Sequence, residues 1–345
     1  MKVFYYSGMQ NLIERSGVGR AIYHQRQAAE ENGLELAGGL RDADVVHINT
    51  IFPGSLMMAF RAKARHIKVV YHAHSTKEDF RNSYIGSNAF AGLFGMWIKL
   101  CYSMSDVIIT PTEYSKKLLM SYGIRKRIVP VSNGIDTDYY DREKADGKSF
   151  RQKYGYKEYD KVIMSVGLPI DRKGLLDFIK LAESLPQYKF IWFGSTNMSL
   201  VPNRVRKAMR NAPSNMTFAG YAQKGQLRDA YAGSDLFLFL SKEETEGIVV
   251  LEALSMKIPV LIRDIPVYSD WLLDGCNVYK DRTLVAFEDR IVNMMDGRLP
   301  CLVKSGRIVA ETRMIGDIGH ELRRVYESIP AREGAGCHGV FHPEC

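Results

Sequence analysis

Short apolar runs alternate with longer amphipathic stretches along most of this chain. A run of four to eight apolar residues between polar ones is typical of a strand buried in a parallel sheet. Because such runs alternate with helical stretches, we expect βαβ units with helices on both faces of each sheet. The predicted strands are Lys2–Tyr6, Asp44–Ile48, Ile67–His72, Asp106–Thr110, Ile128–Ser132, Lys161–Gly167, Lys189–Gly194, Met216–Ala219, Asp235–Leu240 and Ile258–Ile262.

The alternation is interrupted between Asn133 and Lys161, where the chain is polar and charged. We interpret this segment as the linker between two Rossmann-like domains of an α/β protein. A final helical stretch, Asp317–Tyr326, is expected to cross back to the first domain. The predicted units are an amino-terminal domain (1–155), a carboxyl-terminal domain (156–316), the returning helix (317–330) and an irregular tail (331–345).

Composition narrows the class of protein. With 345 residues, 46% apolar and 25% charged, the chain has the make-up of a globular protein with two ordinary domains. Its formal charge of +8 indicates an anionic partner: nucleic acid, an anionic membrane or a nucleotide-sugar.

We expect no secretory signal, since the chain opens on a strand, and its five cysteines favour reduced thiols in the cytosol. The apolar stretch Ala89–Ile98 is shorter than the ~20 residues that span a bilayer.

Two carboxylates flank a predicted strand-to-helix turn in the second domain. Glu244 follows the strand Asp235–Leu240, Gly247 permits a tight turn, and Ile248 begins an apolar helix that contains Glu252. Ligands of open α/β sheets bind at the carboxyl ends of strands. Free backbone N–H groups at the helix start suit a diphosphate, and the carboxylates suit sugar or ribose hydroxyls. Alone, two such glutamates would indicate a solvated acidic helix end.

Two further loops have the chemistry of phosphate sites. Gly17 and Gly19 stand in Ser16–Arg20, before a helix, and allow close approach of backbone to phosphate. A dinucleotide fingerprint is disfavoured there, because Ile22 occupies the third glycine position. The second loop, Asp171–Gly174, offers the adjacent cations Arg172 and Lys173. A solvated turn is the alternative interpretation of this loop.

Histidines and acidic pairs are further candidates for catalytic or metal-binding groups. His72 and His74 alternate at the end of a strand, so His74 should lie nearer the ligand and His72 deeper. The pairs Asp42–Asp44 and Asp136–Asp138 fit ordinary turn chemistry, and we predict no metal. Cys337, His338, His342 and Cys345 in the tail are spaced too irregularly to favour a metal clip.

A predicted amphipathic helix, Leu56–Lys68, places Arg61, Arg65 and Lys68 on one face and Leu56, Phe60 and Ile67 on another. Its end overlaps the predicted strand Ile67–His72, so the boundary between the two elements is left open. Packing on the sheet is the default, and docking on an anionic membrane is the alternative. The apolar stretch Phe90–Trp97 would either cover an acyl chain or belong to the core, and we favour the core.

The motif Glu244–Glu252 resembles the donor site of retaining family-4 glycosyltransferases, which have the GT-B fold of two facing Rossmann-like domains. From Met1 to about Pro330 the chain resembles the bacterial members that extend monoglucosyldiacylglycerol. The segments that carry this resemblance are Glu14–Arg20, Val45–Thr50, Tyr71–Thr76, Pro111–Lys117, Ser132–Asp136 and Phe190–Gly194.

The resemblance implies a role for each candidate residue. Glu252 would hold the ribose, Glu244 and His74 would face the donor sugar, and Lys173 would contact phosphate. Where the family has a second phosphate-binding arginine this chain has Leu168, so we assign that role to Arg172. Gly17 and Gly19 would approach the diphosphate, opposite Gly247 and Ile248.

The expected activity is transfer of galactose or glucose from UDP-galactose or UDP-glucose to a membrane glycolipid, with retention of configuration. No cofactor is expected, since the UDP-sugar is a substrate, and the enzyme would associate peripherally with the inner face of the cell membrane. A polysaccharide acceptor and a non-catalytic lipid- or sugar-binding module are the alternatives. A nucleic-acid partner is not expected, because no nucleic-acid motif accompanies the positive charge.

Overall fold

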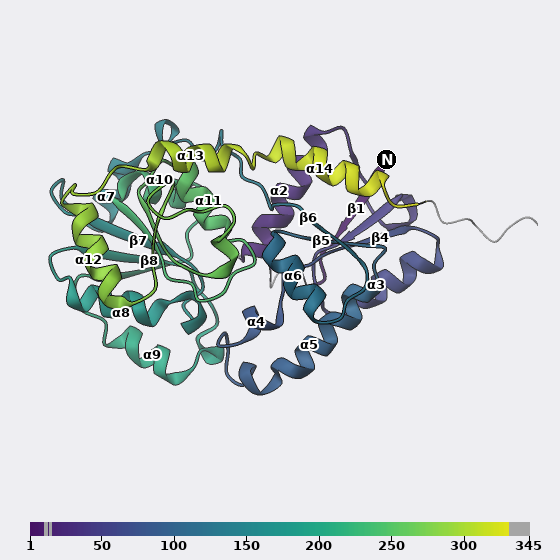
Figure 1. Cartoon of the computed structure of the whole chain (residues 1–345), viewed down its shortest axis with the longest axis horizontal. Coiled ribbons are helices and arrows are strands. Elements are labelled where there is room, and N and C mark those ends of the chain that lie inside the picture. Colours follow the sequence, from purple (N-terminus) through teal and green to yellow (C-terminus); the bar gives the residue numbers. More distant parts are fainter. Residues whose placement is uncertain (10–12, 14–15, 331–345) are drawn as a thin grey trace, which may run out of the picture.

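The computed structural model describes residues 1–330 apart from 10–12 and 14–15. Two domains lie side by side, each built on a six-stranded sheet whose strands are all parallel (Figure 1). The predicted α/β fold with two Rossmann-like domains is thereby confirmed. The tail considered for a metal clip, and Glu14 and Arg15 beside the glycine loop, lie outside the described residues.

The amino-terminal sheet has the strand order β2-β1-β3-β4-β5-β6. Its central strands are buried along their whole length, which explains their almost continuous apolar sequence. The strands are β1 (Lys2–Tyr6), β2 (Glu35–Leu36), β3 (Val45–Ile48), β4 (Lys68–His72), β5 (Val107–Thr110) and β6 (Arg127–Pro130). The helices are α2 (Gly17–Glu31), α3 (Pro53–Ala64), α4 (Lys77–Phe80), α5 (Ser87–Ser103) and α6 (Glu113–Ser121), with a 3-10 turn at Leu40–Asp42.

The carboxyl-terminal sheet has the order β12-β11-β10-β7-β8-β9. Its strands are β7 (Val162–Val166), β8 (Lys189–Phe193), β9 (Met216–Gly220), β10 (Leu236–Phe239), β11 (Val260–Arg263) and β12 (Tyr279–Asp281). The helices are α7 (Gly147–Tyr154), α8 (Leu175–Ser184), α9 (Asn203–Arg210), α10 (Lys224–Gly233), α11 (Ile248–Ser255), α12 (Leu284–Met295) and α13 (Val303–Glu311). Short 3-10 turns cover Arg142–Lys144, Asp171–Lys173, Met198–Leu200 and Pro266–Tyr268.

The order of this second sheet reverses between β7 and β10, which are hydrogen-bonded neighbours. The chain leaves these two strands toward opposite edges of the sheet, so their carboxyl ends open into a crevice. Ligands of doubly wound sheets bind at this kind of switch point. The loop after β7 carries Lys173 and the loop after β10 carries Glu244, so the topology brings the two predicted motifs together.

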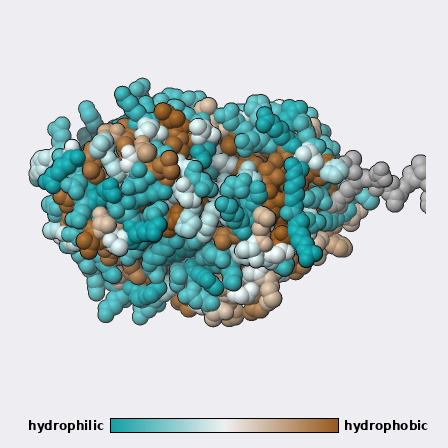
Figure 2. Space-filling view, in the orientation of Figure 1, coloured by the Kyte–Doolittle hydropathy of each residue, from teal (hydrophilic) through white to brown (hydrophobic). Residues whose placement is uncertain are grey.

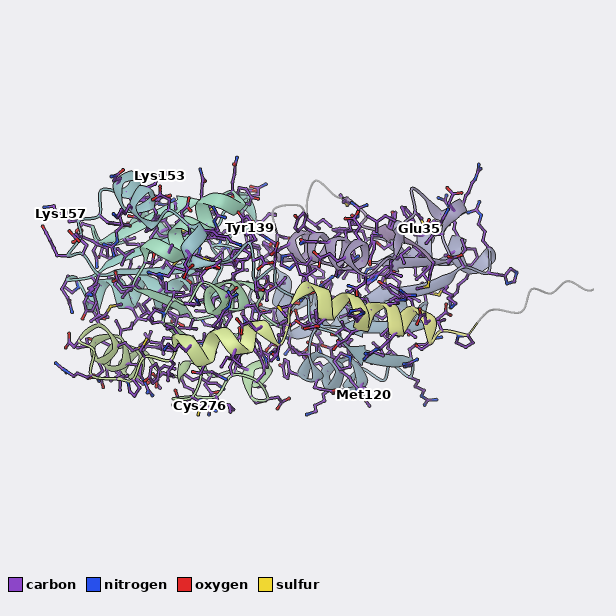
Figure 3. All side chains as sticks on the ribbon, turned by 90° about the horizontal axis from the view of Figure 1, so that it is seen from above. Glu35, Met120, Tyr139, Lys153, Lys157 and Cys276 are labelled. Carbon is purple, nitrogen blue, oxygen red and sulfur yellow. The ribbon has the colours of Figure 1, made fainter. Side chains whose placement is uncertain are left out.

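The last helix, α14 (Ile315–Glu327), lies on the amino-terminal domain, although the chain reaches it from α13 on the other domain (Figures 1 and 3). Its buried face, which includes Ile318 and Leu322, joins Val3 of β1 in one apolar cluster. The hydroxyl of Tyr326 lies 2.6 Å from His47 Nδ1 and 3.1 Å from the Tyr5 hydroxyl. Helix α14 is therefore part of the amino-terminal core.

The polar segment between the two sheets contains a helix that the apolar pattern did not indicate. Helix α7 begins after Asp146, whose side chain accepts a hydrogen bond from Ser149 N (2.9 Å), and ends at Gly155 in the left-handed conformation. Phe150 of α7 and Tyr140 are buried in the apolar cluster of the carboxyl-terminal domain. The segment before residue 155 therefore packs on the carboxyl-terminal domain, and the domain boundary at 155 stays a prediction.

Two predictions about the surface of the amino-terminal domain were wrong. Helix α3 ends at Ala64, so Lys68 lies in β4, and its Nζ donates to the Tyr326 carbonyl (3.2 Å). The helix cannot continue to Lys68, because His66 adopts the left-handed conformation (φ 58°). The stretch Phe90–Trp97 is not core throughout, since Phe90 and others in α5 point outward.

Helix α5 exposes a row of apolar side chains. Phe90 and Leu93 are each 60% exposed and Met96 is 64% exposed, while Ala91 and Ile98 on the other face are buried. Figure 2 shows pale brown side chains along the lower edge of the molecule, where Figure 1 places α5. None of the helices in the described part of the chain combines the length and apolar character needed to cross a bilayer.

Candidate active site

A cavity of about 570 Å³ lies between the two domains and is lined by residues of both. Every residue that the sequence analysis selected for the site contributes to its wall. These residues are Gly17, Gly19 and His74 from the amino-terminal domain and Arg172, Lys173, Glu244, Gly247, Ile248 and Glu252 from the carboxyl-terminal domain. The structure therefore brings the separate motifs to one place, while the role of each residue stays a prediction.

Lys173 and Glu244 form a buried ion pair at the switch point, Nζ against Oε1. Gly174, at φ +80°, allows the β7–α8 loop to lie directly on β10: a Cβ there would come within 2.2 Å of the Leu240 carbonyl oxygen. Because the loop lies against β10 at Gly174, the neighbouring Lys173 is within reach of Glu244 in the loop that follows β10. Burial raises the pKa of Glu244, but Lys173 and Arg172 outweigh it and hold that pKa below its usual value. The carboxylate is therefore ionised and presents oxygens to the cavity.

Arg172 lines the cavity but also connects the two domains. Its Nε donates to Ser83 Oγ (2.9 Å), and its Nη1 donates to the Glu243 carbonyl (3.0 Å). Ser83 follows α4 in the amino-terminal domain, whereas Glu243 follows β10. The guanidinium thus holds the two walls of the cavity together, and a direct contact with phosphate stays a prediction.

Glu252 is buried in α11 and is already surrounded by donors. It accepts hydrogen bonds from the hydroxyls of Tyr140 (2.6 Å) and Tyr231 (3.0 Å), and Arg20 Nε lies 3.8 Å away. Arg20 Nη1 also donates to the Tyr140 hydroxyl (2.8 Å). Burial lowers the pKa of Arg20, but Glu252 and the neighbouring tyrosines together raise it by more. The net shift is upward, so the guanidinium is charged. Arg20 comes from the amino-terminal domain, so this ion pair crosses the cavity.

Two helix N-termini face the cavity from opposite sides. Helix α2 begins at Gly17, where an added Cβ would meet no atom within 4 Å, so the backbone is open to a ligand. Helix α11 begins at Ile248, after Gly247 in the left-handed conformation (φ +91°). Unpaired N–H groups and the helix dipole favour an anion at each start. Lys173 adds a cation to the same space, so the cavity suits a doubly charged group such as a diphosphate.

His74 lines the cavity and His72 lies behind it in the protein, as strand alternation predicted. Their rings stack with centroids 4.2 Å apart, and His74 Nε2 lies 2.9 Å from Asn49 Oδ1. Burial lowers the pKa of His74 to about 3. The ring is therefore neutral near pH 7 and suits hydrogen bonding to hydroxyls better than proton donation.

Sequence reasoning did not select Arg20, Asp79, Asn133 or Tyr221, which also line the cavity. Arg20 directly follows the glycine loop and could have been selected as a cation at a phosphate site. Asn133 lies in Ser132–Asp136, one of the segments that carry the family resemblance, although no role was assigned to it. Asp79 and Tyr221 carry no local signal, because Asp79 lies in a polar segment and Tyr221 follows β9 in an ordinary turn. Their positions depend on how the two domains face each other.

The β10–α11 loop is held against the amino-terminal domain by hydrogen bonds. The buried Glu246 carboxylate accepts bonds from Asn133 N (3.0 Å) and Nδ2 (2.7 Å) and from Ser132 Oγ. The Thr245 carbonyl accepts bonds from Thr112 Oγ1 (2.9 Å) and Ser115 Oγ (3.0 Å) at the start of α6. The loop that carries Glu244 is therefore positioned by both domains.

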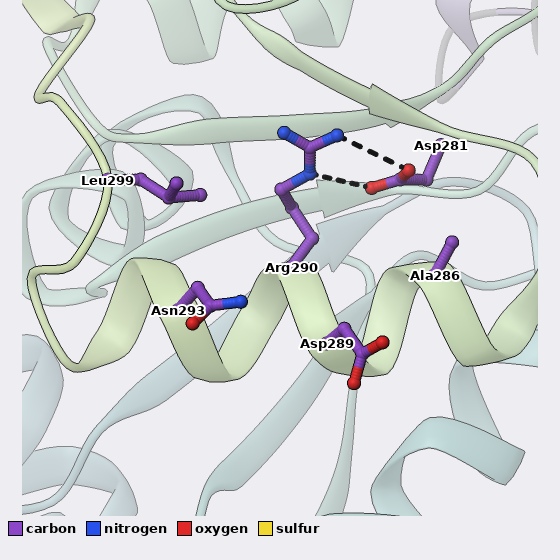
Figure 4. Close-up of a pocket in the computed structure, with 6 residues that line it drawn as sticks. All are labelled: Asp281, Ala286, Asp289, Arg290, Asn293 and Leu299. Carbon is purple, nitrogen blue, oxygen red and sulfur yellow. Dashed lines mark hydrogen bonds and ion pairs between the residues drawn. The ribbon is translucent and has the colours of Figure 1, made fainter.

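A smaller hollow of about 240 Å³ lies beside α12 on the carboxyl-terminal domain (Figure 4). Its cation, Arg290, is already paired with Asp281 (Nε to Oδ2, 3.0 Å), which leaves little charge for an anionic ligand. Among the described residues, no group of three or more His, Cys, Asp or Glu side chains is placed to hold a metal ion. The cavity between the domains is the stronger candidate for a functional site.

Comparison with known proteins agrees with this geometry. Residues 10–139 match the family described as Glycosyltransferase Family 4, and residues 146–298 match that described as Glycosyl transferases group 1. The chain is 38% identical over 331 residues to the processive diacylglycerol alpha-glucosyltransferase of Acholeplasma laidlawii, a match that covers 95% of this chain and 98% of the relative. It is 26% identical to the alpha-galactosylglucosyldiacylglycerol synthase of Streptococcus pneumoniae, over 73% of this chain and 69% of that enzyme.

Among solved structures, the Anabaena protein Alr3699/HepE in complex with UDP and glucose superposes with a TM-score of 0.76 at 16% identity. That match covers 95% of this chain and 99% of the other. The two facing domains, each built on a parallel sheet, have the GT-B fold. The chain belongs to family 4 of these glycosyltransferases.

Proposed function

We propose that this enzyme transfers galactose or glucose from UDP-galactose or UDP-glucose to monoglucosyldiacylglycerol, with retention of configuration at the sugar. The observation that carries the proposal is the buried Lys173–Glu244 pair, which shares one cavity with Glu252 and two helix N-termini. In this arrangement a diphosphate meets cationic and N–H groups, and hydroxyls meet carboxylates.

The chain's own groups would act by positioning and by charge stabilisation. In the transfer step, the bond between the sugar C1 and the diphosphate oxygen breaks, and a bond from C1 to the acceptor oxygen forms on the same face. The acceptor proton passes to the departing diphosphate oxygen. Lys173 and the two helix N-termini stabilise the charge that develops on this oxygen. Glu244 orients the donor sugar and Glu252 the ribose, so no covalent intermediate with the protein is required.

The glycolipid acceptor is supported by the names of two relatives: one is a diacylglycerol glucosyltransferase, and the other is a synthase of galactosylglucosyldiacylglycerol. It is also supported by a surface that we call the α3–α5 face, made by the exposed side chains of Met57, Phe60, Phe90, Leu93 and Met96. Trp97 of α5 donates to the Ile51 carbonyl before α3 (2.7 Å), which connects the two helices. Exposed cations, Arg61 and Lys99, lie on these helices.

Apolar side chains accompanied by cations suit the interface of an anionic leaflet. We therefore propose that the α3–α5 face rests on the inner face of the cell membrane, so that a lipid acceptor reaches the cavity without leaving the bilayer. This arrangement favours a lipid acceptor over a polysaccharide.

Product analysis tests the proposed function. The purified enzyme is incubated with vesicles that contain monoglucosyldiacylglycerol and an anionic lipid, with UDP-galactose or UDP-glucose in separate reactions. We expect release of UDP and an α-linked diglycosyl lipid with at least one donor. Absence of both products from both reactions would refute the proposal, and UDP release without lipid product would refute the acceptor.

A further inference from the structure

A carboxylate of the amino-terminal domain, Asp79, enters the cavity opposite the carboxyl-terminal cations. Asp79 stands in the first turn of the short helix α4, and its Oδ2 accepts a hydrogen bond from Thr76 N (3.1 Å). In return, Asp79 N donates to Thr76 Oγ1 (3.1 Å). Among the described residues, the hydrogen-bond donor to this carboxylate is Thr76 N, which binds Oδ2. The other oxygen, Oδ1, is available to a ligand in the cavity.

The segment after Asp79 fixes its position against the donor side. The Asn82 carbonyl accepts a hydrogen bond from Arg172 N (3.3 Å), and Ser83 Oγ accepts one from Arg172 Nε (2.9 Å). The segment that follows Asp79 is therefore hydrogen-bonded to the loop that carries Lys173, which connects Asp79 to the donor side of the cavity.

The charges around Asp79 indicate which ligand group it would bind. Burial raises the pKa of Asp79 by more than Arg172 lowers it, so the net shift is upward. The charged carboxylate is therefore costly unless a hydrogen-bond donor binds it. A diphosphate would be repelled by this carboxylate and attracted to Lys173 and the helix N-termini. A sugar hydroxyl, in contrast, donates readily to a carboxylate. The donor sugar is assigned to Glu244 on the other domain, so Asp79 is left for the acceptor.

This reasoning rests on the proposed transferase function. We propose that Asp79 Oδ1 accepts a hydrogen bond from a hydroxyl of the acceptor sugar next to the attacking one and so aims the attacking oxygen at the donor C1. The proton of the attacking hydroxyl passes to the departing diphosphate oxygen. Asp79 neither gains nor loses a proton over the cycle and acts by orienting the nucleophile.

The substitution Asp79→Asn tests this assignment, because the amide oxygen can still accept from Thr76 N while the charge is lost. We expect kcat/KM for monoglucosyldiacylglycerol to fall by about 10- to 100-fold, the loss typical of a hydrogen bond to a charged group. The KM for the UDP-hexose and the rate of its acceptor-free hydrolysis should change less than about twofold. Asp79→Ser provides a second variant without the charge, for use if the asparagine variant does not fold.

A matched control separates this role from a structural one. Glu78→Gln removes the neighbouring carboxylate, which accepts a hydrogen bond from the Tyr122 hydroxyl and does not line the cavity. We expect this control to transfer at nearly the wild-type rate.

Three outcomes would overturn the assignment: unchanged acceptor kcat/KM in Asp79→Asn, an equal loss in Glu78→Gln, or a raised UDP-hexose KM in acceptor-free hydrolysis. The last would place Asp79 on the donor sugar instead. Failure of the wild-type enzyme to make any diglycosyl lipid would instead refute the proposed function, so the two proposals fail in distinguishable ways.

Discussion

At the scale of single residues, the site depends on charges that are buried as pairs. The Lys173 side chain is 17% exposed and that of Glu244 is 9% exposed, so each depends on the other for its charged state. Breaking a buried pair typically costs about 3–5 kcal/mol, because one charge stays behind without a partner. Glu252 and Arg20 form a second, looser pair at 3.8 Å. A substrate can replace one member of such a pair, because its own charged or polar groups can bind the remaining partner.

Replacement of Lys173 should separate the catalytic from the structural role of this pair. We expect Lys173→Ala to lower turnover by about 10²- to 10³-fold, the loss typical of a charge that stabilises a leaving group, and to lower the free energy of unfolding while the protein stays folded. The double variant Lys173→Met/Glu244→Gln should recover stability but not turnover. Urea unfolding and UDP release measure the two effects, and wild-type turnover in purified Lys173→Ala would contradict the assignment.

Glu243 gives the contact between the domains a dependence on pH. Burial raises its pKa from the ordinary value of 4.5 to about 7, although the Tyr114 hydroxyl donates to it (2.8 Å). Below pH 4.5 the group is protonated whether the protein is folded or not, so its contribution to stability is fully present. As the pH rises through 7 the folded protein must give up this proton, and that contribution is lost.

The wild-type protein should therefore lose thermal stability between pH 5 and pH 8 relative to Glu243→Gln, whose side chain does not titrate. The difference in Tm between the two proteins at each pH is the measurement. A difference that does not change with pH would contradict this account.

At the scale of helices and strands, the sequence predicted those elements whose pattern is local. The β10–α11 turn was predicted because an apolar strand, Gly247 and an apolar helix follow one another directly. The edge strands β2 and β12 were missed, since two or three residues are too few to show a pattern. Helix α7 was missed because it is short and mostly polar and so shows no apolar periodicity. Its Asp146 cap and Gly155 end therefore fit a linker equally well. The true end of α3, at Ala64, carries no glycine signal, because the residue with positive φ that follows it is His66.

The apolar row on α5 shows why exposure could not be predicted from composition alone. A run such as Phe90–Trp97 has the same sequence character in a core and on a membrane-facing helix. Whether such a run is buried depends on whether another element covers it. In the structure, Phe90, Leu93 and Met96 are exposed.

Substitutions in this row test the proposed membrane contact. We expect Phe90→Asp/Leu93→Asp to weaken binding to anionic vesicles by about tenfold or more, since both apolar burial and charge then oppose association. Val285→Asp is the matched control, because Val285 is 71% exposed on the other domain. Co-sedimentation with vesicles measures binding. Equal binding of the two variants would contradict a role for the α3–α5 face.

At the scale of the whole molecule, the site exists because two domains face each other. The donors around Glu252 come from Arg20, Tyr140 and Tyr231, which are far apart in the chain, and no local pattern relates them. The sequence could predict which loops matter, because each loop follows its own strand. It could not predict that Arg172 bridges the domains or that Asp79 enters the cavity, because both depend on how the domains pack.

The central claim is that the two domains jointly hold a nucleotide diphosphate, and amide hydrogen exchange with and without saturating UDP tests it most directly. The account predicts slower exchange in three segments: 16–20 at the start of α2, 167–174 after β7, and 244–252 at the start of α11. Protection confined to one domain, or centred on the hollow beside Arg290, would contradict it.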